Sequence, residues 1–546
     1  MKIRQLILSI LLLCATAVSA QFHSVDWSAV RGDSLLPVCT QVLELPSDYD
    51  SYKYSAHIEY PEFQRMSDAD VAGYSIVEKY GTLPEMPVVE CHVGVQAKRA
   101  QLDVAFLPVV MRDGKFYRIN SYKLVVDKQL VQRPQRAAAS ASGRYAASSV
   151  LSTGKWVRIA VEENGVYKIT DSEFRKMGFA NPSKVRLYGY GGHILPETGL
   201  ASLPDDLVEV PLWRENGYAL FYANGTIKWK YSGGRYVHSQ NVYSNYACYF
   251  LTESEAAPMT FDEVVYQPTT STVYTSYNDY ALYEKEKKSL CSYGRVLVDN
   301  DAFSSTAGRA KNYSFAIDGA MDNPAVVDLS FATGGENASK VVVLYGDFNS
   351  TFEAGSLTIP RVVSGEVGKI AEGKFTIPGG VAGKSTFYLL HRTDDNSLVG
   401  YLDYLRLNYR RLLALRGANT LFRGDMADGS KARFEIAGCN ANTRVWDVSS
   451  PVAIKEVKGT LNGTVYSVVA PAGVNDNLVA VDVKGSFPSV KMLGEVPNQN
   501  LHAIGQADMV IIIPSNGLFK SAAERLAEAH RTMDGLTVEV VTAQQA

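Results

Sequence analysis

Short stretches in which apolar and polar residues alternate, separated by turns, recur through most of this 546-residue chain. Val327, Leu329 and Phe331, for example, alternate with Asp328 and Ser330. The same period of two is found at residues 89–96, 341–345 and 405–409. Because successive side chains of a β-strand point to opposite faces, the pattern predicts strands with one buried face. The fold class we expect is therefore mainly β, with several β-sandwich or β-rich domains in series.

The first twenty residues have the features of a secretory signal peptide. Lys2 and Arg4 precede a short apolar run at residues 6–13, and small residues end the segment. The run is too short to span a bilayer, so we expect it to direct export and then to be removed. Cys14 leaves a lipoprotein signal as an alternative, which is disfavoured because Leu13 stands where a small residue is expected.

Changes in composition divide the rest of the chain into segments. Residues 132–149 are rich in Ala and Ser and have nothing with which to build a core, so they predict a flexible linker. The strand patterns on either side predict successive β-rich domains. We expect a signal peptide at 1–20, an N-terminal β domain at 21–131, a β domain with a short helix at 150–255, a β-sandwich at 256–415 and a small β domain at 416–500.

Turn and capping residues predict several local connections. Arg-Asp-Gly-Lys at 112–115 and Asn-Gly at 164–165 each predict a hairpin between the two strands that flank them. Thr170 or Asp171 is expected to cap a short helix that ends at Met177 and is followed by a glycine.

The pattern changes near residue 505. Residues 509–513 form a continuous apolar run, which predicts a strand buried on both faces. A helix is expected at 518–531 and a second strand at 536–541, which together make one β-α-β unit of a parallel sheet. Because one such unit cannot cover both faces of a sheet, we expect residues 501–546 to be the start of an incomplete α/β domain.

Five cysteines remain after removal of the signal peptide: Cys39, Cys91, Cys248, Cys291 and Cys439. They are scattered and include no C-x-x-C pair, which argues against a zinc site. An odd number leaves at least one thiol unpaired within the chain. A disulfide such as Cys39–Cys91 stays open, because sequence spacing does not fix the distance between two strands. Cys248 lies in a strand pattern and is expected to be a buried residue rather than a nucleophile.

No pattern in the chain identifies a catalytic site by itself. The sequence contains no phosphate-binding loop, no H-E-x-x-H and no G-x-S-x-G, and His193 and His530 are expected in a turn and at a helix end. The acidic groups at 299–301 and 394–396 predict turns, with calcium binding as the less favoured alternative. We therefore assign no catalytic, cofactor-binding or metal-binding residue, and a structural calcium ion is the only cofactor left open. Lys and Arg number 54 against 57 Asp and Glu, so no net field attracts nucleic acid.

One stretch combines aromatic and basic residues. Trp229, Tyr231 and Tyr236 stand among neighbouring Lys and Arg residues. The pattern favours a packed strand whose lysines reach solvent along its edge. The alternative is an exposed face that binds a sugar or a peptide.

Several longer motifs, taken in order, resemble one family. They are Trp-Val-Arg-Ile at 156–159, Lys-Val-Arg-Leu-Tyr-Gly-Tyr-Gly-Gly at 184–192, Asn-Val-Tyr-Ser-Asn-Tyr at 241–246, Tyr-Leu-Asp-Tyr at 401–404, Ala-Asp-Met-Val-Ile-Ile at 507–512 and Phe-Lys-Ser-Ala-Ala-Glu-Arg-Leu-Ala at 519–527. With the signal peptide and the first β domain, this order resembles the type IX secretion system sortases of the Bacteroidetes over nearly the whole chain. The last two motifs are the most specific, since they resemble the first strand and helix of a gingipain-type peptidase domain.

The resemblance implies an exported cysteine endopeptidase and transpeptidase at the outer-membrane surface of the cell. Such sortases remove the C-terminal signal domain of exported cargo proteins and attach the cargo to anionic lipopolysaccharide, and an outer-membrane barrel protein is their expected partner. The family's catalytic His and Cys lie downstream of Ala546, so we expect this chain alone to lack the catalytic dyad and to be inactive. The alternative is a non-enzymatic binding or adhesion module of the secretion apparatus at the cell surface.

Overall fold

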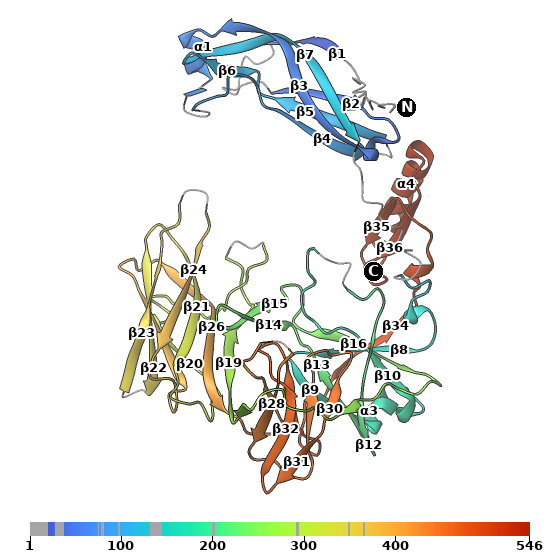
Figure 1. Cartoon of the computed structure of the whole chain (residues 1–546), viewed down its shortest axis with the longest axis vertical. Coiled ribbons are helices and arrows are strands. Elements are labelled where there is room, and N and C mark those ends of the chain that lie inside the picture. Colours follow the sequence, from blue (N-terminus) through green and yellow to red (C-terminus); the bar gives the residue numbers. More distant parts are fainter. Residues whose placement is uncertain are drawn as a thin grey trace, which may run out of the picture. The chain divides into compact units, whose positions relative to one another are not determined.

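The computed structural model describes residues 20–27, 38–74, 76–77, 81–96, 99–130, 145–198, 203–290, 294–347, 350–363, 366–427 and 429–546. The chain forms two compact units, one of residues 1–145 with 501–546 and one of residues 146–500, whose elements Figure 1 shows. The predictions for Cys14, for Cys291, for nearly all of the signal peptide and for most of the Ala/Ser-rich linker lie outside the described residues. Within the described residues, no helix is both long and apolar enough to cross a membrane.

In the first unit, residues 20–130 build two antiparallel sheets around one core. One sheet has the order β1-β7-β3, with β6 also paired to β7: β1 (Ala20–Ser24), β3 (Tyr52–Arg65), β6 (Val109–Arg112) and β7 (Lys115–Leu130). The other has the order β2-β5-β4: β2 (Cys39–Glu44), β4 (Val89–Gln96) and β5 (Arg99–Phe106). Leu102 of β5 and Tyr122 and Leu124 of β7 lie in the shared core. The short helix α1 (Asp68–Gly73) starts with a capping box at Ser67.

Two predictions for this part have clear outcomes. The hairpin at 112–115 is confirmed, because Arg112 pairs with Lys115 and the two turn residues have positive φ angles of 49° and 67°, as a type I′ turn requires. Cys39 and Cys91 are free thiols. They lie on β2 and β4, the two strands that flank β5, so their backbones stand about 9–10 Å apart, which is too far for a disulfide.

Residues 509–542 form the predicted parallel β-α-β unit. It consists of β35 (Met509–Ile513), α4 (Lys520–Ala529), a π-helical turn (His530–Asp534) and β36 (Val538–Thr542). The helix starts later than predicted because Phe519 has a left-handed backbone, with φ of 68°. The expectation that β35 is buried on both faces is wrong for the structure, because Val510 and Ile512 are 50% and 60% exposed.

The second unit begins with two sheets that face each other. One has the order β11-β10-β16-β8-β34: β8 (Trp156–Val161), β10 (Val185–Tyr188), β11 (Glu209–Val210), β16 (Ala247–Glu253) and β34 (Lys491–Val496). The other has the order β12-β13-β9: β9 (Gly165–Thr170), β12 (Trp213–Glu215) and β13 (Tyr218–Ala223). The predicted helix is α3 (Asp171–Lys176), which starts with a capping box between Thr170 and Glu173 and buries Phe174 in the core between the sheets.

The hairpin predicted at 164–165 is wrong. The strands before and after this turn, β8 and β9, belong to different sheets and do not pair with each other. The side chain of Asn164 donates to the carbonyl of Ile227 and accepts from the backbone N–H of Gly225. These contacts hold the turn in a conformation that leads from one sheet to the facing sheet. A hairpin would instead have placed both strands in the same sheet.

The predicted β-sandwich is present as two four-stranded sheets. One has the order β19-β26-β21-β24: β19 (Ser276–Glu284), β21 (Ala325–Gly334), β24 (Lys369–Ile377) and β26 (Val399–Leu412). The other has the order β20-β25-β22-β23: β20 (Ala310–Ser314), β22 (Ser339–Asp347), β23 (Ser350–Ile359) and β25 (Thr386–Arg392). Val327, Leu329 and Phe331 point into the core, as the alternation predicts. Asp328 and Ser330, on the opposite face of β21, are nevertheless also buried.

Nine more strands of this unit form two further sheets. One has the order β17-β30-β29-β33-β27: β17 (Asp262–Val264), β27 (Asn419–Phe422), β29 (Thr443–Asp447), β30 (Lys455–Val457) and β33 (Leu478–Asp482). The other has the order β18-β28-β32-β31: β18 (Val273–Tyr274), β28 (Lys431–Ile436), β31 (Gly459–Asn462) and β32 (Val465–Pro471). β17 and β18 thus precede the sandwich in the sequence but pair with strands that follow it. A second core joins the first of these sheets to β13, with Trp446 packed near Tyr218, Leu220 and Tyr222.

Candidate functional site

A β-hairpin covers the outer face of the sandwich at Asp328. It consists of β14 (Ile227–Ser232) and β15 (Arg235–Gln240), joined by two glycines with positive φ. Trp229 pairs across the hairpin with His238, and Tyr231 pairs with Tyr236, so four rings share one face. Trp229 stacks on Tyr280 of β19 with 3.6 Å between ring centres, while the lysines of β14 are exposed. The structure thus supports the packed strand rather than an open aromatic face.

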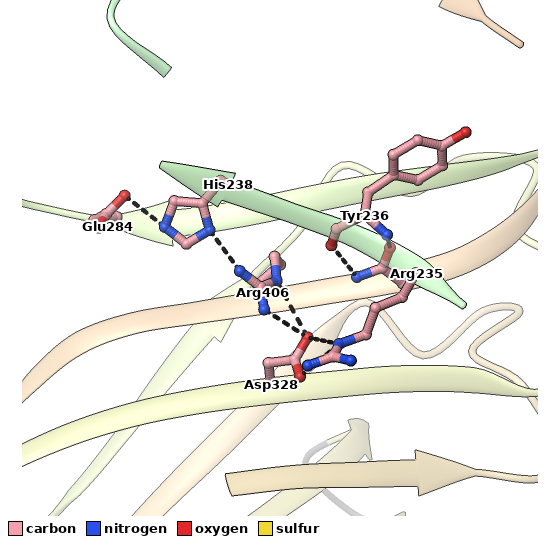
Figure 2. A network of polar contacts seen from close by, with 7 residues as sticks. Arg235, Tyr236, His238, Glu284, Asp328 and Arg406 are labelled. Atoms are coloured by element: carbon pink, nitrogen blue, oxygen red, sulfur yellow. Dashed lines mark hydrogen bonds and ion pairs between the residues drawn. The ribbon is translucent and has the colours of Figure 1, made fainter. Parts of the chain in front are cut away.

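Figure 2 shows the ionic network that forms where this hairpin meets the sandwich. Asp328 of β21 lies directly opposite Arg406 of β26 and accepts hydrogen bonds from its Nε and Nη2 at 3.1 and 3.0 Å. Arg235 of the hairpin donates from Nε to the same carboxylate at 3.0 Å. Asp328 and Arg406 are only 3% and 4% exposed. Asp328 is buried on the outer face because it serves as the anion between two guanidinium groups.

The network continues through His238 to an acidic cluster. Nη1 of Arg406 lies 2.8 Å from Nδ1 of His238, and Nε2 of His238 lies 3.1 Å from a carboxylate oxygen of Glu284. Since a guanidinium only donates, Nδ1 must accept, so the ring proton is on Nε2, beside the carboxylate of Glu284. Oxygens of Glu284, Glu286 and Asp403 come within 4.8 Å of one another. Burial, and then the charges of Glu284 and Asp403, raise the pKa of Glu286 to about 7.

Tyr236 joins the hairpin to both neighbouring parts of the unit. Its backbone N–H donates to the side-chain oxygen of Asn408 at 2.8 Å, and its backbone carbonyl accepts from the amide of Asn408 at 3.0 Å. Its hydroxyl donates to the carbonyl of Val474 at 3.0 Å. Burial raises the pKa of Tyr236 to about 12, so the hydroxyl stays protonated.

Beside Tyr236 lies a cavity of about 120 Å³. It is lined by aromatic rings, amides, a histidine and an arginine: Asn164, His193, Tyr222, Asn224, Trp229, Tyr231, Tyr236, Tyr280, Leu421, Arg423, Val474, Asn475 and Asn477. Arg423 is 4% exposed, and its guanidinium carbon lies 4.7 Å from the ring centre of Tyr236 and 4.9 Å from that of Tyr280. Burial, and then the charge of Lys228, lower the pKa of His193, so this ring is neutral near pH 7.

The cysteines and His530, which the sequence also singled out, lie in surroundings typical of residues with a structural role. Burial raises the pKa of the Cys39 thiol to about 11, and burial also raises the pKa values of the Cys248 and Cys439 thiols. A thiol of this kind stays protonated near neutral pH and is a poor nucleophile. His530 follows the last residue of α4 and lies 2.6 Å from Asp534.

The two acidic groups considered for calcium form turns. Asp299 accepts from the hydroxyl of Tyr283 and from the backbone N–H of Asp301. Asp395 accepts from the backbone and hydroxyl of Ser397 and from the amide of Asn337. The acidic cluster that the fold assembles is a different one, at Glu284, Glu286 and Asp403.

Sequence reasoning found the aromatic residues of the hairpin but missed Arg423 and the acidic cluster. Arg423 reaches Tyr280 from 143 positions away in the sequence, and no local pattern marks this contact. Glu284 and Glu286 lie on one side of β19 and its continuation, and Asp403 comes from the neighbouring strand β26. Only the pairing of β19 with β26 could have indicated that cluster.

Comparisons with known proteins give an informative match to a solved structure. No family model matches the chain, and no curated protein does. Among solved structures, the crystal structure of dimeric latent PorU from Porphyromonas gingivalis is similar at a TM-score of 0.62 and 26% identity, over 74% of this chain and 38% of that one. The infectious bursal disease virus structures of the Gx strain and of the VP2 subviral particle have TM-scores of 0.14 and 0.16 at 7% identity, which are too low to carry an argument.

Proposed function

We propose that this chain, a PorU-like protein, works in type IX secretion as part of a sortase that processes exported cargo at the cell surface. The observation that carries the proposal is the structural match to PorU at a TM-score of 0.62, with 26% identity over 74% of the chain. The order of the sequence motifs at 156–159, 184–192 and 507–527 supports it independently. The chain spans 38% of the length of the PorU structure, so the proposal concerns the activity of the whole protein.

The reaction that we propose for the whole protein is acyl transfer through a cysteine. A thiolate attacks the peptide bond before the C-terminal signal domain of the cargo, the signal domain leaves as an amine, and the cargo is held as a thioester. An amine of anionic lipopolysaccharide, or water, then attacks the thioester and restores the thiolate. We do not assign this nucleophile to Cys39, Cys248 or Cys439, because burial raises the pKa of each thiol.

The proposed location follows from the N-terminal segment and from the family. A signal peptide at residues 1–20 would direct export, and the protein would then stay at the outer membrane with a barrel protein as partner. The β domains described here would supply contacts to the cargo and to that partner. A non-enzymatic surface module is the second candidate, and the raised pKa values of the Cys39, Cys248 and Cys439 thiols favour it for the chain acting alone.

Deleting the gene in its own organism tests the proposal. We expect surface proteins of the deletion strain to keep their C-terminal signal domains, which mass spectrometry of the outer-membrane fraction detects. Restoring the complete gene should restore cleavage. Normal cleavage in the deletion strain, combined with poor retention of cargo, would favour the non-enzymatic module.

The purified 546-residue chain provides a second test. Incubated with a cargo protein that bears a C-terminal signal domain, it should give no cleavage that a thiol-alkylating reagent blocks. Thiol-dependent cleavage would show that one of the cysteines in this chain is the nucleophile after all. Single Cys→Ser variants at Cys39, Cys91, Cys248, Cys291 and Cys439 would then identify it.

A further inference from the structure

Arg423 is a buried cation that no described acidic residue pairs with. Its Nε donates to the side-chain oxygen of Asn477 at 2.7 Å, and its Nη2 donates to the hydroxyl of Tyr280 at 2.8 Å. Its Nη1 is buried and has no hydrogen-bond partner. Within the described residues, no carboxylate forms an ion pair with it. A buried guanidinium with only neutral partners keeps most of the cost of leaving water.

Two other arginines of the same unit, one buried and one partly buried, are each paired with an acidic side chain. Arg406 meets Asp328 at 3.0 Å, and Arg411 meets Asp279 at 2.8 Å. At Arg423 the rings of Tyr236 and Tyr280 offset part of the charge by cation–π attraction. Ring faces do not accept the remaining in-plane hydrogen bonds of the guanidinium. The two rings therefore hold its orientation but leave a positive edge without an anion.

Arg423 also lines a polar cavity, whose described lining carries a net positive charge near neutral pH. Among the described residues that line the cavity, Arg423 is the one charged side chain at neutral pH, because the lowered pKa of His193 keeps that ring neutral. The hydroxyl of Tyr222, a ring near Arg423, makes no hydrogen bond to a described residue. The amides of Asn224 and Asn475 add further donors to the wall. These groups together are complementary to an anion that accepts several hydrogen bonds.

The size of the cavity limits which anion fits. A volume of about 120 Å³ holds roughly four water molecules at about 30 Å³ each. A carboxylate group with a few attached atoms fits this volume, whereas a larger ligand would have to extend out of the mouth. Guanidinium groups bind carboxylates well, and amide and phenol donors can complete the contacts to both oxygens.

We propose that this cavity is a binding site for a small carboxylate, which supplies the negative charge that Arg423 lacks. The ligand oxygens would take hydrogen bonds from Arg423, from the hydroxyl of Tyr222 and from the amide groups of the wall. The aromatic walls suit a carboxylate carried on a compact polar framework. This proposal does not depend on the sortase assignment, because it rests only on the residues of the cavity.

Titration calorimetry of the full 546-residue chain tests the proposal. The probes are acetate, D-glucuronate and D-glucose, which carry a carboxylate alone, a carboxylate on a sugar ring, and the ring alone. We expect acetate and glucuronate to bind and glucose not to bind. Tighter binding of glucuronate than of acetate would identify an acidic sugar as the source of the carboxylate, and equal binding would identify the carboxylate group alone. Binding of glucose as strong as that of glucuronate would overturn the proposal.

Two variants and one control locate the site. Arg423→Met removes the charge, and because a buried unpaired cation is costly, the variant should stay folded. It should weaken the binding of acetate and glucuronate at least tenfold. Tyr222→Phe removes only the hydroxyl and should weaken binding a few-fold. Arg295→Met, at an exposed arginine, should change nothing. Unchanged binding in a folded Arg423→Met protein, shown by its circular dichroism, would refute the assignment.

Discussion

Replacing Asp328 by Asn tests whether the ionic network fastens the β14–β15 hairpin to the sandwich. Asp328 is the shared acceptor for Arg406 and Arg235, at donor–acceptor distances between 3.0 and 3.1 Å. Asparagine keeps the shape of the side chain but removes its charge, so both guanidinium groups lose their anion. The side chain of Arg406 is 5% exposed and cannot turn to water, whereas that of Arg235 is 23% exposed and can partly do so.

The expected cost follows from this difference in burial. Breaking a buried ion pair by removing one partner costs about 3–5 kcal/mol, mainly because it leaves an uncompensated charge. Since only Arg406 is held fully buried, we expect a loss near the lower end, about 3 kcal/mol. Urea unfolding followed by tryptophan fluorescence measures the loss, because Trp229 lies in the hairpin. Hydrogen exchange should also become faster in β14 and β15 than in β22 at the far sheet of the sandwich.

Two further proteins make this measurement decisive. Glu197→Gln removes an exposed ion pair with Arg295 and should leave the free energy of unfolding almost unchanged. The double variant Asp328→Asn, Arg406→Met removes the orphaned cation as well and should recover part of the lost stability. If Asp328→Asn costs less than about 1 kcal/mol, or if the double variant is no more stable than the single one, the network does not hold the hairpin in the way argued.

Two other predictions concern the carboxyl group of Glu286 and the N-terminal cap of α3. The raised pKa of Glu286, about 7 against an ordinary 4.5, means that the folded state keeps a proton which the unfolded chain releases. The resulting stabilisation is complete below pH 4.5 and is lost as the pH rises to about 7. At about 1.36 kcal/mol per pKa unit, a fully buried Glu286 would contribute a stabilisation of roughly 3 kcal/mol. Because the side chain is partly exposed, we expect a stabilisation of about 1–2 kcal/mol. Glu286→Gln should therefore stabilise the protein by about that amount at pH 8 and hardly at all at pH 4, and an equal effect at both pH values in urea unfolding would contradict the assignment. Thr170→Ala removes the hydroxyl that caps α3 and should cost about 1 kcal/mol in the same assay, while Thr170→Ser should be nearly neutral; equal losses in both variants would show that the cap hydroxyl is not what matters.

Local features of the chain were predictable where a short pattern fully determines the backbone. The hairpin at 112–115 and the capped helix α3 depend on residues within a few positions of one another, and the parallel β-α-β unit is one contiguous segment whose strand and helix patterns follow each other directly. The turn at 164–165 was not predictable, because Asn164 forms its hydrogen bonds with Gly225 and Ile227, which are about 60 positions away. Alternation at 327–331 indicated which residues of β21 face the core, but it could not show that the hairpin covers the other face.

Because contacts between distant residues leave no local pattern, the sequence indicated only the aromatic part of the candidate site. Trp229, Tyr231 and Tyr236 stand close together in the chain and could be noticed as a group. Arg423 directly follows β27 and Asn477 directly precedes β33, and only the tertiary fold brings them to the rings. A sequence contains the aromatic half of such a site as a pattern, whereas its charged half is a consequence of strand pairing over long distances.

The β14–β15 hairpin contacts two buried arginines, Arg406 and Arg423. The positive charge of each is compensated by different partners. Arg406 forms an ion pair with Asp328, which suits a contact between the hairpin and the sandwich that stays formed. Arg423 has aromatic rings, neutral hydrogen-bond partners and a cavity beside it. Tyr236 belongs to both surroundings, because Asn408 of the sandwich fixes its backbone while its ring lies against Arg423. The ionic network therefore sets the position of one wall of the cavity. It follows that loosening the network at Asp328 should weaken carboxylate binding less than removing Arg423 does, since the first change displaces a wall and the second removes the charge that attracts the ligand.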